Sequence, residues 1–172
     1  MGQSSPGSPF LLKGRAIPTK LVSAAALAAV LALSATLAAC SSGPAALSSG
    51  LTARMDQPGA NLNRAEALGI VNAYRSTAGS AALVADAGLD ATAQSLAADY
   101  ARTGTSPKLP AGAVGMRVSA GYANFAETFS GWRNSPADAQ VLASASAQRA
   151  GLGVAYNADS TYGVYWVLVL DD

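Results

Sequence analysis

An apolar run near the N-terminus, closed by the only cysteine of the chain, decides which residues can belong to a folded domain. The run extends from Leu21 to Ala39 without a charged side chain, and three basic residues precede it: Lys13, Arg15 and Lys20. A basic region followed by an apolar stretch and small residues is typical of an export signal that is removed from the mature protein. We therefore leave residues 1–39 out of the reasoning about the fold.

The residues that close this run, Leu37-Ala38-Ala39-Cys40, resemble the lipobox of a bacterial lipoprotein signal peptide. The resemblance implies cleavage before Cys40 and attachment of lipid to its thiol. The alternative is an uncleaved anchor, because residues 21–39 are just long enough to cross a bilayer at about 1.5 Å per residue. Alanine and serine make that stretch only weakly apolar, which favours the lipoprotein. Both interpretations place the domain outside the cytoplasm and tether it to a membrane.

The resemblance to a lipoprotein predicts a location in the cell envelope. In a Gram-negative host the anchor would sit in the outer membrane, facing the periplasm. In a Gram-positive host it would sit on the outer face of the plasma membrane. The membrane is therefore the first expected partner of this chain.

The composition excludes several kinds of chemistry. The chain has no histidine, so a Ser-His-Asp triad, a Cys-His pair and a histidine zinc site are all ruled out. If Cys40 carries lipid, no thiol is left for a disulfide or a nucleophile. Residues 40–172 hold eight basic and ten acidic side chains, a net charge of −2. Because nucleic-acid binding needs clustered Lys and Arg, we do not expect it.

The mature chain divides into a tether and one domain. Residues 40–61 are predicted to be a lipidated cysteine with a flexible linker, because Ser, Gly, Ala and Pro dominate without an apolar period. Residues 62–172 are predicted to form the domain, a suitable length for one hydrophobic core.

Local signals within the domain predict its helices and strands. Helix starts are indicated by capping residues, and helix ends by glycines. Alternating apolar residues predict antiparallel strands over 151–157 and 162–170, and a short strand over Met116–Ala120. These patterns together predict an α+β domain with helices packed on a small antiparallel sheet. The starts lie at Asn63, Asp86, Asn124 and Ser135, and the ends at Gly79 and Gly104.

Several short segments, in this order along the chain, resemble the CAP superfamily, also called sperm-coating-protein-like domains. The resemblance implies an α-β-α sandwich and a cleft that usually holds two histidines and two glutamates. The segments are Ala73-Tyr74-Arg75, Leu83-x-x-Asp86-x-x-Leu89, Ala120-Gly121-Tyr122, Trp132-Arg133-Asn134-Ser135-Pro136 and Gly151-Leu152-Gly153-Val154-Ala155.

The cleft expected from this resemblance is degenerate. Leu96 stands at the position of the first histidine, Asp138 at the second, and Glu127 at one glutamate. No second glutamate follows Glu127. Because both histidine positions are changed, a metal bound through histidines is excluded, and no cofactor is predicted. Tyr122 follows a glycine at a loop edge and is a further candidate for the cleft surface. Glu127 and Asp138 also have a purely structural interpretation, because each stands where a carboxylate completes a helix cap.

These observations favour a lipid-anchored, non-enzymatic binding or structural domain. Its expected partners are cell-wall material, lipid or another envelope protein. One alternative is a metal-independent hydrolase in which Glu127 and Asp138 form an acid/base pair. Another is a carrier of a small apolar ligand in a pocket between helices.

Overall fold

In the computed structural model, which describes residues 47–172, four strands form one sheet in the order β1-β3-β4-β2. β4 lies inside the sheet and pairs antiparallel with both β3 and β2, as the alternating pattern predicts. β1 pairs in parallel with β3 over only two residues, and this short strand was not predicted. The strands are β1 (Val84–Ala85), β2 (Gly115–Ala120), β3 (Arg149–Tyr156) and β4 (Val164–Asp171).

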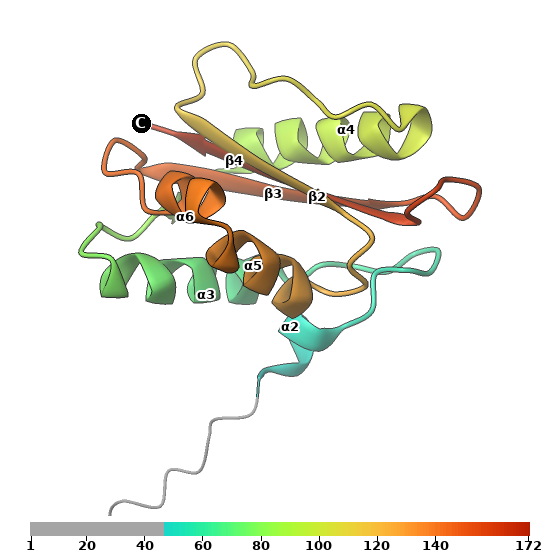
Figure 1. The fold of residues 1–172 in the computed structure, drawn as a ribbon, viewed down its shortest axis with the longest axis horizontal. Coiled ribbons are helices and arrows are strands. Elements are labelled where there is room, and N and C mark those ends of the chain that lie inside the picture. The colour runs from blue at the N-terminus through green and yellow to red at the C-terminus, as the bar shows by residue number, and fades with distance from the viewer. Residues whose placement is uncertain (1–46) are drawn as a thin grey trace, which may run out of the picture. The chain divides into compact units, whose positions relative to one another are not determined.

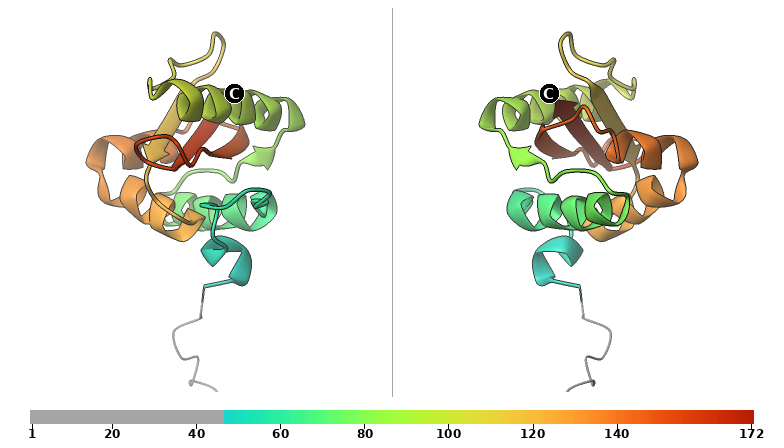
Figure 2. Two further views of the ribbon diagram at one scale, coloured as in Figure 1. Left: turned by 90° about the vertical axis from the view of Figure 1, so that its right-hand side faces the viewer. Right: turned by 90° about the vertical axis from the view of Figure 1, so that its left-hand side faces the viewer.

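Helices cover both faces of this sheet (Figure 1). α4 lies on one face, while α3, α5 and α6 lie on the other, and Figure 2 shows the same layers from two further sides. The predicted α-β-α sandwich is therefore confirmed. The helices are α3 (Arg64–Thr77), α4 (Ala87–Thr103), α5 (Phe125–Asn134) and α6 (Pro136–Leu142).

The central strand β4 explains why two separate apolar cores form. Trp166 and Leu168 pack on the face of α3 and α5, whereas Val167 and Val169 pack on the face of α4. Successive side chains of a strand point to opposite faces, so a strand buried on both faces must be apolar at every position. Residues 164–170 of β4 are all apolar and buried, which meets this requirement.

Three helices begin at the predicted capping residues. The side-chain oxygen of Asn63 accepts a hydrogen bond from the Glu66 N–H at 3.2 Å, and Asp86 and Asn124 cap α4 and α5 in the same way. Gly104 ends α4 with a φ of 68°, a left-handed conformation that suits glycine. The predicted helix start at Ser135 is also confirmed, because α6 begins directly after it, although the Ser135 hydroxyl makes no capping hydrogen bond.

Part of the predicted linker belongs to the domain. The short helix α2 (Ser49–Thr52) buries Leu51, and Met55 is only 3% exposed. The Met55 N–H also donates to the Ala123 carbonyl at 2.7 Å. The expectation of a flexible tether as far as residue 61 is therefore wrong for residues 47–61. Two isolated apolar side chains carry no period, so this packing could not be predicted from the sequence.

The predicted signal segment and Cys40 lie outside the described residues. Among residues 47–172, no helix has the length and apolar character needed to cross a membrane.

Two glycines of β3 let α4 lie directly on that strand. A Cβ on Gly151 would stand 2.0 Å from the Leu89 carbonyl carbon, and one on Gly153 would stand 2.3 Å from the Ala93 carbonyl carbon. Such distances are far inside van der Waals contact, so any other residue would force the helix away. This close approach brings the side chains of α4 to the outer edge of β3.

Candidate functional site

Glu127 acts as a capping residue in the first turn of α5. Its N–H donates to Asn124 Oδ1 at 2.9 Å, and its own Oε2 accepts from the Ala123 N–H at 3.2 Å. The side chain is exposed. These contacts confirm the structural interpretation of Glu127, because its backbone N–H and its carboxylate both form hydrogen bonds at the start of the helix.

Asp138 forms an ion pair with Arg117 of β2. The two side chains are 29% and 25% exposed, so the pair is partly buried between α6 and the sheet. Arg117 Nε is buried and has no hydrogen-bond partner among the described residues. The expectation that Asp138 completes a cap with Ser135 is therefore wrong: its carboxylate instead joins α6 to the edge of the sheet.

The structure does not bring the two acids into one site. Glu127 lies in the first turn of α5 and bonds to the Ala123 N–H, whereas Asp138 lies in the first turn of α6 and pairs with Arg117. Leu96 lies in α4, on the opposite face of the sheet from both acids, where it packs against the buried cluster that includes Val167 and Val169. Three of the four predicted cleft residues are thus dispersed.

Tyr122 is the predicted cleft residue that remains at a surface. Its side chain lies across α5, because a Cβ on Gly131 would stand 3.0 Å from the Tyr122 hydroxyl. Its backbone carbonyl accepts a hydrogen bond from Trp166 Nε1 at 2.9 Å. Tyr122 is 39% exposed, so part of this residue is accessible to a partner.

No cluster of ligands for a metal ion is present in the described part of the chain. Nowhere within residues 47–172 do three His, Cys, Asp or Glu side chains come together.

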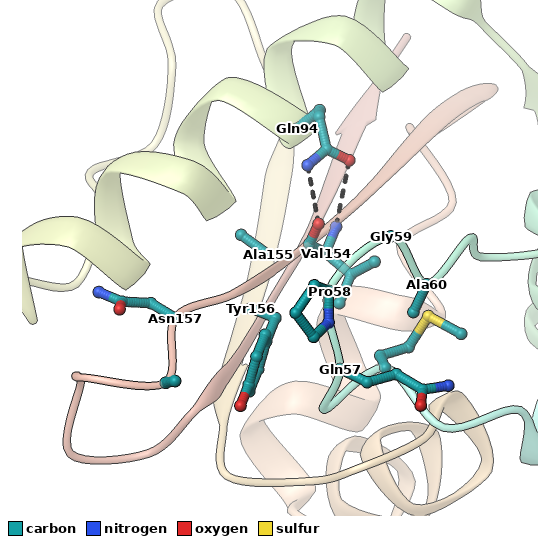
Figure 3. Close-up of a pocket in the computed structure, with 11 residues that line it drawn as sticks. Gln57, Pro58, Gly59, Ala60, Gln94, Val154, Ala155, Tyr156 and Asn157 are labelled. Atoms are coloured by element: carbon teal, nitrogen blue, oxygen red, sulfur yellow. Dashed lines mark hydrogen bonds between the residues drawn. The ribbon is translucent and has the colours of Figure 1, made fainter.

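The outer edge of β3, the edge that faces away from β4, is closed by side chains instead of by another strand. Beyond the two residues that pair with β1, the Leu152 N–H donates to Asp90 Oδ1 at 2.8 Å, and Arg64 Nε donates to the Leu152 carbonyl at 2.7 Å. Gln94 then serves both backbone groups of Val154, as the dashed lines in Figure 3 show. Its amide therefore takes the place of a neighbouring strand.

The hydrogen bonds from Asp90, Arg64 and Gln94 to this edge form a side-chain ladder. A cavity of about 470 Å³ opens where the ladder ends, after Val154 (Figure 3). One wall is the segment 57–60, and the other is the end of β3 with the turn that follows it. None of its lining residues is charged. They are Met55, Gln57, Pro58, Gly59, Ala60, Gln94, Val154, Ala155, Tyr156, Asn157 and Ala158.

A second hollow lies between α3 and α5 and has a volume of about 390 Å³. Its lining is mostly apolar, with one cationic side chain at Arg133, whose guanidinium lies 6.0 Å from the centre of the Phe129 ring. The lining residues are Ile70, Ala73, Tyr74, Thr77, Phe129 and Arg133.

The cavity at the end of β3 escaped the sequence analysis for two physical reasons. Segment 57–60 belongs to the predicted linker. Gln94 is neither charged nor reactive, so its residue type does not indicate a functional role. One available signal was the spacing Gly151-x-Gly153. Glycines at alternate strand positions indicate the close approach of another backbone, here that of α4.

The fold and sequence together define the class of this protein. Residues 68–170, more than half of the chain, match the family model described as CAP, the cysteine-rich secretory protein family. The chain therefore belongs to the CAP family. No curated protein gives a significant match to the sequence.

Solved structures with the same fold include two of MpPR-1i. They have TM-scores of 0.52 and 0.51, each with 21% identity over 63% of this chain, and the match covers 89% and 84% of the MpPR-1i chains. An extracellular protein with an SCP domain from Bacillus anthracis str. Ames has a TM-score of 0.50, with 18% identity over 63% of this chain. The match covers only 40% of the Bacillus protein. At these identities the likeness shows the fold alone.

Proposed function

We propose that this chain is a lipid-anchored CAP domain of a bacterial cell envelope that binds a partner without catalysing a reaction. The observation that carries the proposal is that both candidate acids, Glu127 and Asp138, already form contacts within the fold. Glu127 caps α5 and Asp138 pairs with Arg117, so each carboxylate already has a structural role. General acid/base chemistry requires instead that both groups reach the same reacting bond.

The proposed location rests on the sequence before the domain. The lipobox-like residues end at Cys40, and only six residues separate Cys40 from Leu47, where the described part of the chain begins. An SCP domain of the same fold occurs in an extracellular bacterial protein, which supports an extracytoplasmic place for this chain. The proposed partners are cell-wall material, lipid or another envelope protein, and the proposed binding surface is the cavity at the end of β3.

Turnover assays test the non-enzymatic part of this proposal. The purified protein is incubated with peptide, ester and glycan substrates beside the Glu127→Gln and Asp138→Asn variants. We expect product formation no faster than in buffer for all three proteins. Hydrolysis by the wild type that disappears in Glu127→Gln would overturn the proposal and favour a hydrolase.

The hollow between α3 and α5 supports a second candidate function, the binding of a small apolar ligand. Its apolar lining and single arginine suit a molecule with a hydrocarbon chain and an acidic end. Delipidated protein is offered a radiolabelled fatty acid, beside an Ile70→Lys variant that places a charge in the hollow. Saturable uptake that falls at least tenfold in the variant would support this function, and absence of uptake would reject it.

A further inference from the structure

Alternate residues of β3 direct their backbone groups toward the outer edge of the sheet. The Ala150 carbonyl accepts from Asp86 there, and the N–H and carbonyl of Leu152 and of Val154 bond to side chains on the same edge. Successive residues of a strand alternate in direction, so the next outward residue is Tyr156.

The partner of Tyr156 in β4 confirms this direction. Tyr156 lies opposite Val164, and the Val164 carbonyl accepts from the Gly121 N–H, on the side of β2. Val164 therefore turns its backbone groups away from β3, and Tyr156 turns its own away from β4. Among the described residues, no hydrogen bond satisfies the outward N–H and carbonyl of Tyr156.

The cavity lies at this point of the edge. Figure 3 shows Tyr156 beside Pro58, with Gln94 completing the ladder one step earlier. Gln57 also lines the cavity, and it is exposed. The cavity thus combines an unpaired strand edge with a polar group on the opposite wall.

We propose that an extended, uncharged polypeptide segment of a partner protein enters this cavity and pairs with Tyr156 as an added strand. The inference rests on the proposed binding function and names the class of its ligand. Main-chain hydrogen bonds supply affinity in strand addition, and they require a free donor and acceptor on one residue of the edge. Tyr156 presents both.

The lining of the cavity decides between polypeptide and charged ligands. Because none of its eleven residues carries a charge, a phosphate or carboxylate would lose its hydration without gaining an ion pair. A peptide group is neutral and has one donor and one acceptor, which match those of Tyr156. The volume of about 470 Å³ suits a few residues with small side chains.

The test uses a defined peptide and its N-methylated counterpart. The full-length protein in detergent is titrated with fluorescein-labelled, C-terminally amidated Ala-Val-Ala-Thr-Ala, followed by fluorescence polarisation. The second peptide has the same sequence with N-methyl groups at alternate residues, which remove the donors that an added strand needs. We expect the N-methylated peptide to bind at least tenfold more weakly.

Matched variants locate the binding site. Ala60→Trp fills the cavity, and Ala158→Trp narrows it from the exposed turn should the first variant fail to fold. Ala145→Trp places the same side chain on the exposed loop before β3, at the opposite end of that strand from Tyr156. We expect at least tenfold weaker binding in the cavity variants and unchanged binding in Ala145→Trp.

Three outcomes would overturn the strand-addition proposal. They are equal binding of both peptides, equal binding by the cavity variants, and absence of peptide binding. Cell-wall oligosaccharides are titrated in parallel, and their capture with the same sensitivity to Ala60→Trp would leave the binding function standing while rejecting the polypeptide ligand. Cleavage of the peptide, detected by mass spectrometry in the same samples, would instead reject the non-enzymatic function.

Discussion

Arg75 holds together segments that are distant in the sequence. It is fully buried, and its guanidinium donates to the carbonyls of Ala81, Leu142, Ser144 and Ala147 at 2.7–3.1 Å. Burial lowers the pKa of Arg75, yet an arginine side chain stays charged at neutral pH. Four carbonyl oxygens thus compensate the charge in place of a carboxylate.

The four hydrogen bonds of the Arg75 guanidinium are predicted to be essential for stability. Arg75→Lys keeps the charge but cannot reach four carbonyls, so we expect the free energy of unfolding to fall by about 3 kcal/mol. Urea denaturation followed by circular dichroism measures this loss. Arg102→Lys on the exposed surface of α4 is the control, with a change within about 0.5 kcal/mol. A loss below about 1 kcal/mol for Arg75→Lys would contradict the role assigned to it.

Asp86 is predicted to make stability depend on pH in the acidic range. The Leu89 N–H lowers the pKa of Asp86 most, followed by the Gly88 N–H and by Arg149. A carboxyl whose pKa is lower in the folded state stabilises the fold above its unfolded pKa of about 4, and this contribution disappears as the pH falls through the folded value.

Denaturation between pH 6 and pH 2.5 tests this prediction for Asp86. Asp86→Asn keeps a good capping residue but removes the titrating group. The variant should therefore lose less stability on acidification than the wild type does. Asp159→Asn, in the exposed turn after β3, should follow the wild type. Identical pH profiles for all three proteins would be evidence against the role of Asp86.

Local residue interactions could be predicted from the sequence, and distant ones could not. Asn63, Asp86 and Asn124 each cap a helix through a residue three positions away, a spacing that is visible in the sequence. Arg117 and Asp138 are 21 positions apart, and their pairing depends on how α6 packs against β2. The same holds for Arg75, whose partners lie as far as 72 positions away.

At the scale of elements, the contact of α4 with β3 depends on Gly153. Gly153→Ala would place its Cβ 2.3 Å from the backbone of Ala93, so the helix must move and lose contacts. We expect a loss of about 2–3 kcal/mol in the free energy of unfolding, typical of overpacking.

The matched control is Gly69→Ala in the exposed part of α3, where a Cβ meets no other atom. Alanine favours a helix interior over glycine, so this variant should gain about 0.5–1 kcal/mol. Thermal denaturation of both variants distinguishes the two effects by sign. Equal stability of Gly153→Ala and the wild type would mean that α4 does not lie as close as described.

Elements with a strong apolar period could be predicted, and those held by tertiary contacts could not. The helices and the pair β3–β4 follow from capping residues and from alternation. β1 has only two residues, too few to show a period, and it pairs with residues 149–150 of β3. Segment 47–61 lacks a period, and it is fixed by Leu51 and Met55 in the core.

At the scale of the whole molecule, the α-β-α order could be predicted, whereas the arrangement of the site could not. The ordered segments that resemble the CAP superfamily predict the fold, and the family match confirms the resemblance. The expected cleft residues separate because Leu96 lies on one face of the sheet and both acids lie on the other. Which residues share a face depends on the direction of each helix, and no local spacing encodes that direction.

We propose that a lipid-anchored domain binds its partner outside the cytoplasm, and the N-terminus of the mature protein reports on that anchor. The full chain is produced in a bacterium that processes lipoproteins, purified from membranes and digested, and its N-terminal peptide is measured by mass spectrometry. We expect a peptide that begins at Cys40 and carries the mass of a diacylglyceryl group, and we expect no such peptide from Cys40→Ser. A chain that keeps residues 1–39, or a Cys40 without lipid, would overturn the proposed anchor.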